Sequence, residues 1–243
     1  MQYLLINISI DKVSLTNPFF ILKSLSSIEF SISIITSDAL GPKSVSKTLV
    51  TRHIFKNYNK DYDDDFTEVS ALSPGVMGIT GLETSETVKS IVDMIKPDRV
   101  IAIDALASRK MERVNSTIQI STAGISPGGG VGNKRKALNK DYLGVDVIAI
   151  GVPTVVDAAT LTSDVLDLAI DNLISQSNEG ENFYNMLKQL KEDEKYHLIK
   201  ESLDPYDKNL IVTPKDIDET IENLSIIISE GLNRSLHPGR ITN

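Results

Sequence analysis

Between residues 36 and 175, short apolar runs alternate with helical patterns, and glycine and proline residues separate them. Two of these runs, Val100–Ile103 and Val147–Ile150, each continue into a polar or glycine-rich stretch. Alternating strands and helices favour βαβ units, in which helices cover a mostly parallel sheet. We therefore expect an α/β fold with a mostly parallel central sheet.

Proline and capping residues set the bounds of the expected elements. Thr80 and Glu83 have the spacing of a capping box before a helix. Thr154 is expected to cap the helix that Pro153 opens, with Asp157 near its positive end. The expected helices cover Lys43–Phe55, Ser85–Ile95, Pro153–Ile174, Asn182–Leu203 and Pro214–Ser235. The expected strands cover Phe30–Ile35, Val69–Leu72, Arg99–Ile103, Ile118–Ser121 and Val147–Ile150.

The first 35 residues differ in texture from the rest of the chain. They are rich in Ile, Ser, Leu and Phe and have weak periodicity. We interpret residues 1–35 as a divergent N-terminal segment and residues 36–243 as one domain. The part of this domain from about residue 176 is charged and helical in pattern, and residues 175–180 form a linker candidate.

Charge and hydropathy exclude several classes of protein. The net charge of −8 argues against non-specific DNA binding through the whole surface. No apolar run reaches the roughly 18–20 residues of a membrane span, and no stretch has the order of features of a signal peptide. We expect a cytoplasmic protein that binds neither membrane nor nucleic acid directly.

Two aspartates follow apolar runs. Asp104 directly follows Val100–Ile103, and Asp38 follows the run over residues 33–37. An open α/β sheet places its chemistry at the carboxyl ends of its strands. Two facing carboxylates cannot both ionise cheaply, so one keeps a proton and the pair can activate water, as in peptide hydrolysis. An aspartate there can equally be a turn former or a helix cap, so spacing alone leaves both interpretations open.

Residues 126–136 are glycine-rich and then basic, and they end in Lys134, Arg135 and Lys136. One interpretation is a close-approach loop whose backbone amides or cations hold an anion. The segment matches neither the dinucleotide fingerprint nor the P-loop, which needs Lys-Ser/Thr after its last glycine. The alternative is a surface turn with solvated lysines.

The chain has no residue pattern for a metal site or a serine triad. It has no cysteine, and His53, His197 and His237 lie far apart in the sequence without zinc-site spacing. It also has no Gly-x-Ser-x-Gly elbow. We therefore expect no metal and no cofactor.

Ten motifs follow one another along the chain: DALGPK at 38–43, TRHIF at 51–55, PGVMG at 74–78, TGLET at 80–84, IAIDALASR at 101–109, ERVN at 112–115, PGGGVGNKR at 127–135, IAIGVPTVVD at 148–157, LIVTPK at 210–215 and EGLN at 230–233. Together and in this order they resemble the germination protease (spore protease) family of spore-forming bacteria. The resemblance covers about residues 36–243.

The resemblance implies an activity and its residues. Members of this family are atypical aspartic endopeptidases that cleave the small acid-soluble proteins coating spore DNA, early in germination. The two family aspartates correspond here to Asp38 and Asp104. The substrates carry an acidic residue beside the cleaved bond, and Lys134, Arg135 and Lys136 are candidates for contacting it.

The resemblance also implies a fold and a life cycle. The fold it implies is a three-layer α/β/α sandwich, similar to that of the hydrogenase maturation endopeptidases. Family members are made as inactive precursors, lose an N-terminal propeptide and assemble as homotetramers. The implied location is the cytoplasm of the forespore, which becomes the spore core.

The N-terminal segment departs from the family pattern. The family has a glycine-rich turn shortly before the first aspartate, where this chain reads Glu29–Ile32. We interpret residues 1–35 as the product of a shifted frame or misplaced start, with residues 1–25 poorly packed. Two alternatives to an active endopeptidase stay open: an inactive remnant, or a metal-dependent maturation-type peptidase with Asp38 and Asp104 as ligands.

Overall fold

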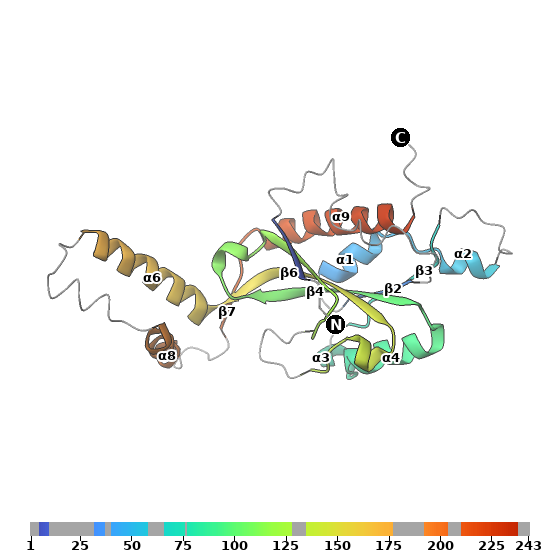
Figure 1. Cartoon of the computed structure of the whole chain (residues 1–243), viewed down its shortest axis with the longest axis horizontal. Helices are drawn as coiled ribbons and strands as arrows, with labels where there is room; N and C mark the ends of the chain where they lie inside the picture. The colour runs from blue at the N-terminus through green and yellow to red at the C-terminus, as the bar shows by residue number, and fades with distance from the viewer. Residues whose placement is uncertain are drawn as a thin grey trace.

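The computed structural model describes residues 5–9, 32–36, 40–57, 66–75, 77–127, 135–176, 192–203 and 210–237. Within these residues the chain forms a mixed α/β fold around one seven-stranded sheet (Figure 1). The strands are β1 (Leu5–Ser9), β2 (Ile32–Thr36), β3 (Val69–Leu72), β4 (Arg99–Ser108), β5 (Thr117–Ser121), β6 (Asp146–Asp157) and β7 (Ile211–Val212). The helices are α1 (Leu40–Ser46), α2 (Arg52–Asn57), α3 (Met77–Thr80), α4 (Thr84–Ile95), α5 (Lys140–Leu143), α6 (Ala158–Gln176), α8 (Glu192–Leu203) and α9 (Ile217–Leu236).

The sheet is parallel from β6 to the edge strand β3 and antiparallel on the side of β1, β5 and β7. The strands follow the order β1-β5-β6-β4-β2-β3, and β7 pairs with β6. β3, β2, β4 and β6 run parallel to one another. β5 and β7 run antiparallel to β6, and β1 runs antiparallel to β5. The predicted parallel core is confirmed, but the sheet as a whole is mixed because it also contains antiparallel pairs.

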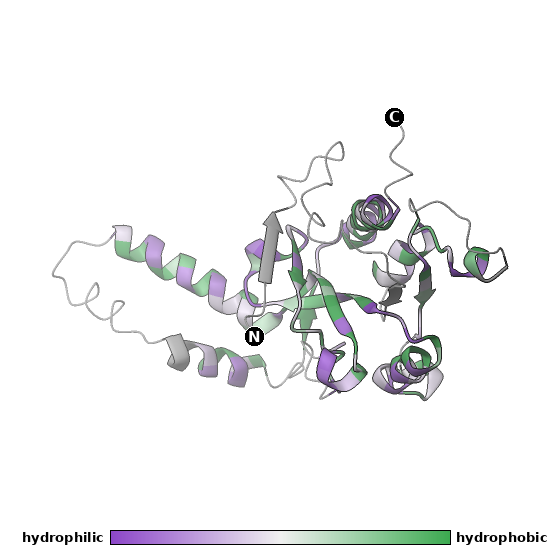
Figure 2. Cartoon of the chain, turned by 45° about the vertical axis from the view of Figure 1, so that its right-hand side comes forward, coloured by the Kyte–Doolittle hydropathy of each residue, from purple (hydrophilic) through white to green (hydrophobic). Residues whose placement is uncertain are grey.

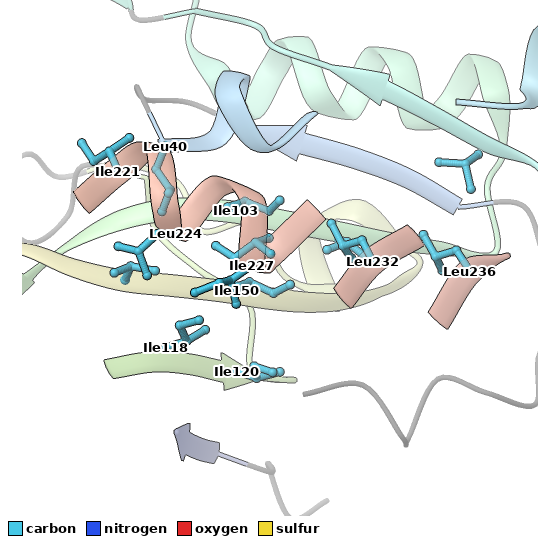
Figure 3. Packing of buried hydrophobic residues seen from close by; sticks show 14 residues of the cluster. Leu40, Ile103, Ile118, Ile120, Ile150, Ile221, Leu224, Ile227, Leu232 and Leu236 are labelled. Atoms are coloured by element: carbon cyan, nitrogen blue, oxygen red, sulfur yellow. The ribbon is translucent and has the colours of Figure 1, made fainter. Parts of the chain in front are cut away.

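One face of the sheet carries α1 and α9. Along α9, Leu224, Ile228 and Leu232 recur at helical spacing, so they form one apolar face. This face packs on the buried side chains of Ile103 in β4 and Ile150 in β6 (Figure 3). The larger hydrophobic core therefore lies between the C-terminal helix and the centre of the sheet.

The opposite face carries α4 and α5. Val88 and Val92 of α4 pack against Val100 and Ala102 of β4, together with Leu143 of α5. Because side chains alternate along a strand, β4 presents its even-numbered residues to α4 and its odd-numbered residues to α9. Helices thus cover both faces of the sheet.

Side chains at the end of α9 hydrogen-bond to the backbone of the loop after α1. Asn233 Oδ1 accepts the Leu49 amide at 2.7 Å, and Asn233 Nδ2 donates to the Lys47 carbonyl at 3.0 Å. One turn further on, His237 Nε2 lies 3.0 Å from the Leu49 carbonyl oxygen. We call Asn233 and His237 with these backbone partners the α9 clamp.

The prediction of a single helix over Lys43–Phe55 is wrong. The chain forms α1 and α2 with a loop between them, because the amide of Leu49 bonds Asn233 instead of a carbonyl in its own helix. The Thr51 amide likewise donates to the Val69 carbonyl in β3, at 3.0 Å. Partners distant in sequence therefore interrupt a helical pattern.

The capping box expected at Thr80 and Glu83 is also wrong, although α4 itself is confirmed. Glu83 is the N-cap residue of α4 and makes no side-chain cap bond. The Thr80 hydroxyl instead accepts the Leu82 amide at 3.2 Å, inside the turn that follows α3.

Pro153 does not open a helix. β6 continues through it to Asp157, and a bulge accommodates the proline: Leu106 pairs with Pro153 and Ala107 with Val155, so Thr154 is skipped in the pairing with β4. α6 begins only at Ala158, where Asp157 Oδ1 accepts two amides of the first turn. The expected position of Asp157 at the positive end is confirmed, whereas the cap expected at Thr154 is wrong.

The remaining expectations are met in part. The strand over Val69–Leu72 is confirmed, β2 and β5 lie close to their expected ranges, and α9 starts three residues later than expected. α6 and α8 lie against each other in an arm that extends away from the sheet (Figures 1 and 2). Residues 182–191 of the expected helix, and residues 1–4 and 10–25 of the segment expected to pack poorly, lie outside the described residues. β1 was not anticipated.

Loss of the α9 clamp is expected to destabilise the fold. Asn233→Ala leaves the Leu49 amide and Lys47 carbonyl without this partner, which costs about 1–3 kcal/mol. For a chain of this size, each kcal/mol lowers Tm by about 2–4 °C. Differential scanning calorimetry gives the shift. The matched control is Arg234→Ala, which breaks the partly exposed i,i+4 pair with Glu230 and is expected to cost under about 1 kcal/mol. Equal losses in the two variants would contradict a special role for Asn233.

Candidate active site

Asp104 lies inside the central strand β4 and is 3% exposed. The sequence predicted that the strand ends there, which is wrong, because β4 continues to Ser108 in pairing with β6. The pairing with β2 stops earlier: Thr36, the last residue of β2, pairs with Ile103. Asp104 is thus the first residue of β4 beyond the end of the neighbouring parallel strand.

The neighbour of Asp104 across the sheet is a glycine. Asp104 pairs with Gly151 of β6, and Gly151 in turn pairs with Gln119 of β5. A Cβ atom added to Gly151 would collide with the side chain of Leu106. Leu106 lies on the same face as Asp104, two residues along the strand. Because Gly151 has no side chain, Leu106 can close this side of the site with an apolar wall.

Asp38 lies outside the described residues, between β2, which ends at Thr36, and α1, which begins at Leu40. β2 is parallel to β4, and its last residue, Thr36, pairs with Ile103, the residue before Asp104. The approach of the two carboxyl groups to each other stays a prediction.

The first turn of α4 lies at the same end of the sheet as Asp104. α4 joins β3 to β4, which run in the same direction, so the helix must run antiparallel to both strands. Its buried face reads Thr84, Ser85, Val88 and Val92. The two valines pack on the amino-terminal half of β4, so Thr84 and Ser85 lie toward the Asp104 end of the sheet. Sequence reasoning missed this polar turn, although a Thr-Ser pair at a helix start was a readable signal.

Thr84 is buried at the start of α4, with 3% exposure. Its Oγ1 atom makes no hydrogen bond within the part of the chain that the structure describes. The amide groups of a first helical turn carry partial positive charge. The first turn of α4 therefore brings a buried hydroxyl group and a positive helix end to the end of the sheet that holds Asp104.

Lys136 is attached to the same turn of α4. Its amide donates to Glu83 Oε1 at 3.2 Å, and its Nζ lies 3.7 Å from Glu86 Oε1. The hydrogen bond from the Lys136 amide lowers the pKa of Glu83 below its ordinary value, and the nearby Ser85 side chain and the charges of Lys136 and Arg135 act in the same direction. Lys136 therefore holds its own segment against α4.

The three basic residues predicted to contact substrate differ in how the structure places them. Arg135 is half-buried, Lys136 is exposed, and Lys134 lies outside the described residues. Their contact with an acidic substrate residue stays a prediction. The contacts of Lys136 with Glu83 and Glu86 place Lys136 itself beside the first turn of α4.

The residues flanking the glycine-rich segment pair with each other. The Ile125 amide donates to the Leu138 carbonyl at 3.0 Å, and the Leu138 amide donates back at 2.7 Å. Gly124 has φ +88°, and a Cβ atom there would collide with the carbonyl oxygen of Leu138. Glycine is therefore required at position 124, where the two flanking residues pair, and the sequence pattern did not reveal this requirement.

The histidines lie on separate elements: His53 on α2, His197 on α8 and His237 after α9. Among the described residues, no three His, Cys, Asp or Glu side chains are grouped in a way that could hold a metal ion. No helix in the described ranges is long and apolar enough to cross a membrane.

Comparison with known proteins finds extensive similarity. The model of the germination protease family, peptidase A25, matches residues 28–182 and 170–242. A germination protease of Clostridium perfringens is 54% identical over 207 residues, which cover 85% of this chain and 64% of that protein. One from Caldanaerobacter subterraneus is 52% identical over 205 residues, covering 84% of this chain and 63% of that protein. One from Bacillus subtilis is 48% identical over 233 residues, with the same coverage. The chain therefore spans a little under two thirds of the length of the curated relatives it matches.

The attachment of Lys136 to α4 is expected to depend on pH. The pKa of Glu83 is lowered in the folded chain, so this stabilisation is present above the unfolded pKa and is lost as pH falls through the folded value. We expect the Lys136 amide proton shift to titrate with a midpoint below the ordinary value of 4.5, as followed by NMR. Glu83→Gln should abolish this titration and Glu86→Gln should keep it. A midpoint at or above 4.5 would contradict the assignment.

Proposed function

Because the chain belongs to the germination protease family, we propose that it is an aspartic-type endopeptidase that cleaves small acid-soluble spore proteins. The observation that carries this proposal is the buried carboxyl of Asp104, placed on the central strand where β2 ends. It lies in the motif over residues 101–109 that resembles the family. The function of the longer relatives is extended to this chain as part of the proposal.

The proposed chemistry uses Asp38 and Asp104 as a pair that shares one proton. The ionised carboxylate accepts a proton from a water molecule, whose oxygen attacks the peptide carbonyl carbon. The protonated partner donates its proton to the carbonyl oxygen. When the tetrahedral diol collapses, the C–N bond breaks. The carboxyl that took a proton from water gives it to the leaving nitrogen, and the other, now ionised, carboxylate accepts a proton from one diol hydroxyl, which restores the shared-proton pair. The positive first turn of α4, with the Thr84 hydroxyl, supports the developing negative charge on oxygen.

The basic segment supplies the proposed substrate specificity. An acidic side chain beside the cleaved bond is proposed to meet Lys134, Arg135 and Lys136. Lys136 is supported in this role by its position at the first turn of α4, with 56% of its side chain exposed. Its pairing with Glu86 is close to the surface, so a substrate carboxylate can compete for it at low cost.

We also propose the finer fold and the biological setting. Helices on both faces of the sheet support a three-layer α/β/α sandwich like that of the hydrogenase maturation endopeptidases. Residues 1–35 are proposed to be a divergent N-terminal segment, and residues 36–243 the protease domain with a helical part from about 176. The proposed state is a homotetramer made from an inactive precursor in the cytoplasm of the forespore and spore core.

Each aspartate is expected to be required separately. Asp104→Asn and Asp38→Asn keep the shape of the side chain but remove its acid–base chemistry, so turnover of purified small acid-soluble protein should fall about 10²–10⁴-fold. Tm should change little. Asp93→Asn, on the exposed side of α4, is the control and should retain full activity.

Two outcomes distinguish the alternatives to this assignment. Near-normal cleavage by either Asn variant would remove that aspartate from the mechanism. A parent chain that does not cleave, beside a version with a family-like N-terminus that does, would favour an inactive remnant.

Activity and thermal stability are expected to survive chelation. The chain has no cysteine, and its described residues include no group of three ligands placed to hold a metal. Cleavage rate and Tm should therefore be unchanged after dialysis against a chelator. A fall in either quantity that one divalent ion restores would favour the metal-dependent alternative.

A further inference from the structure

The segment between β3 and α4 exposes apolar side chains close together. Met77, Ile79 and Leu82 are 46%, 86% and 59% exposed. We call these residues the α3 patch. Single exposed apolar residues are common, but three within six residues of one short segment are a candidate surface for binding a partner. None of the residues of α3 is buried, so this turn contributes nothing to the core.

Backbone hydrogen bonding and two glycine bends fix the conformation of the turn that carries the α3 patch. The Gly81 amide donates to the Met77 carbonyl at 2.8 Å and closes one helical turn. Gly75 and Gly81, with φ of +76° and +70°, form the bends on either side. Both bends use backbone conformations that other residues adopt with strain. The exposure of the patch is therefore built into the local fold.

The patch lies at the end of the sheet that holds Asp104. β3 ends at Leu72 and α4 begins at Thr84, so the segment between them lies at the carboxyl end of the parallel strands. Figure 1 shows α3 on the same side of the sheet as α4. This is the face to which the even-numbered residues of β4, including Asp104, belong.

Positive charge adjoins the patch. Glu83, the residue after Leu82, accepts the amide of Lys136, and Arg135 is the preceding residue. Lys136 keeps 56% of its side chain exposed. A ligand that covers the patch and continues along this edge therefore meets an apolar surface and then cations.

We infer that the α3 patch binds the polypeptide substrate through an apolar side chain, next to an acidic side chain that faces Arg135 and Lys136. This inference rests on the proposed function and deepens it. Continuity with the candidate active site favours a peptide over a second copy of the chain, because a second copy seated on the patch would obstruct the edge at which substrate reaches Asp104.

Binding is measured in the Asp104→Asn chain, so that the assay does not depend on turnover. The probe is a fluorescein-labelled small acid-soluble spore protein, followed by anisotropy. Adding Ile79→Ser and Leu82→Ser together is expected to raise Kd about tenfold, since each removes an apolar contact. With Asp104 intact, the same pair should raise KM about tenfold and change kcat by less than about twofold, because a docking contact acts equally on substrate and transition state.

Met94→Ser is the matched control. Met94 is 70% exposed but lies in the last turn of α4, at the opposite end of the helix. It should change neither Kd nor KM, and neither set of substitutions should alter Tm. An unchanged Kd in the double variant, an equal effect of Met94→Ser, or no binding by the parent chain would each overturn the inference.

Sedimentation and cleavage measurements distinguish substrate docking from self-association and from catalysis. If the double variant alters the sedimentation coefficient while Kd stays the same, the patch is a contact between copies and the inference is wrong. If the chain with Asp104 intact does not cleave, but the double substitution still weakens binding tenfold, the proposed function fails while the docking surface stands.

Discussion

The unequal pairing of β4 with its two neighbours determines the rest of the structure. β6 pairs with β4 over its full length, whereas the pairing with β2 ends at Ile103. This difference leaves Asp104 on a rigid strand at the place where the sheet narrows. A carboxyl group on a strand interior is held more precisely than one on a loop, which suits the catalytic role proposed for Asp104. The glycine opposite and the helix on the same face of the sheet give it its surroundings.

Local patterns predicted the elements whose causes are local. The strand Val69–Leu72 and the end of α4 at Lys96, which adopts a left-handed conformation before Pro97, follow from neighbouring residues. The failures have distant causes. Lys43–Phe55 has a helical pattern, but Asn233 binds its middle. Pro153 usually opens or interrupts an element, yet the bulge at Thr154 lets β6 continue past it. No window of adjacent residues contains either partner.

The candidate site also contains residues that local patterns predicted and residues whose placement depends on distant contacts. Asp104 could be found from its strand, and the resemblance pointed to Asp38 as its proposed partner. The continuation of the strand to Ser108 could not be predicted, because the pairing with β6 sustains it. Thr84 became a candidate only when the direction of α4 was known. The basic segment was visible as charge, but its anchoring to Glu83 depends on a backbone amide, and sequence patterns do not record where an amide points.

The α9 clamp has a consequence for synthesis on the ribosome. Asn233 binds the backbone 184 residues earlier in the chain, and α9 completes the larger core. Translation runs from the N-terminus, and contacts this distant form slowly because a long loop must close first. The region around α1 therefore cannot reach its final arrangement until α9 has left the exit tunnel. Up to that moment the nascent chain exposes an unfinished apolar face, and the larger core is completed only after α9 is made.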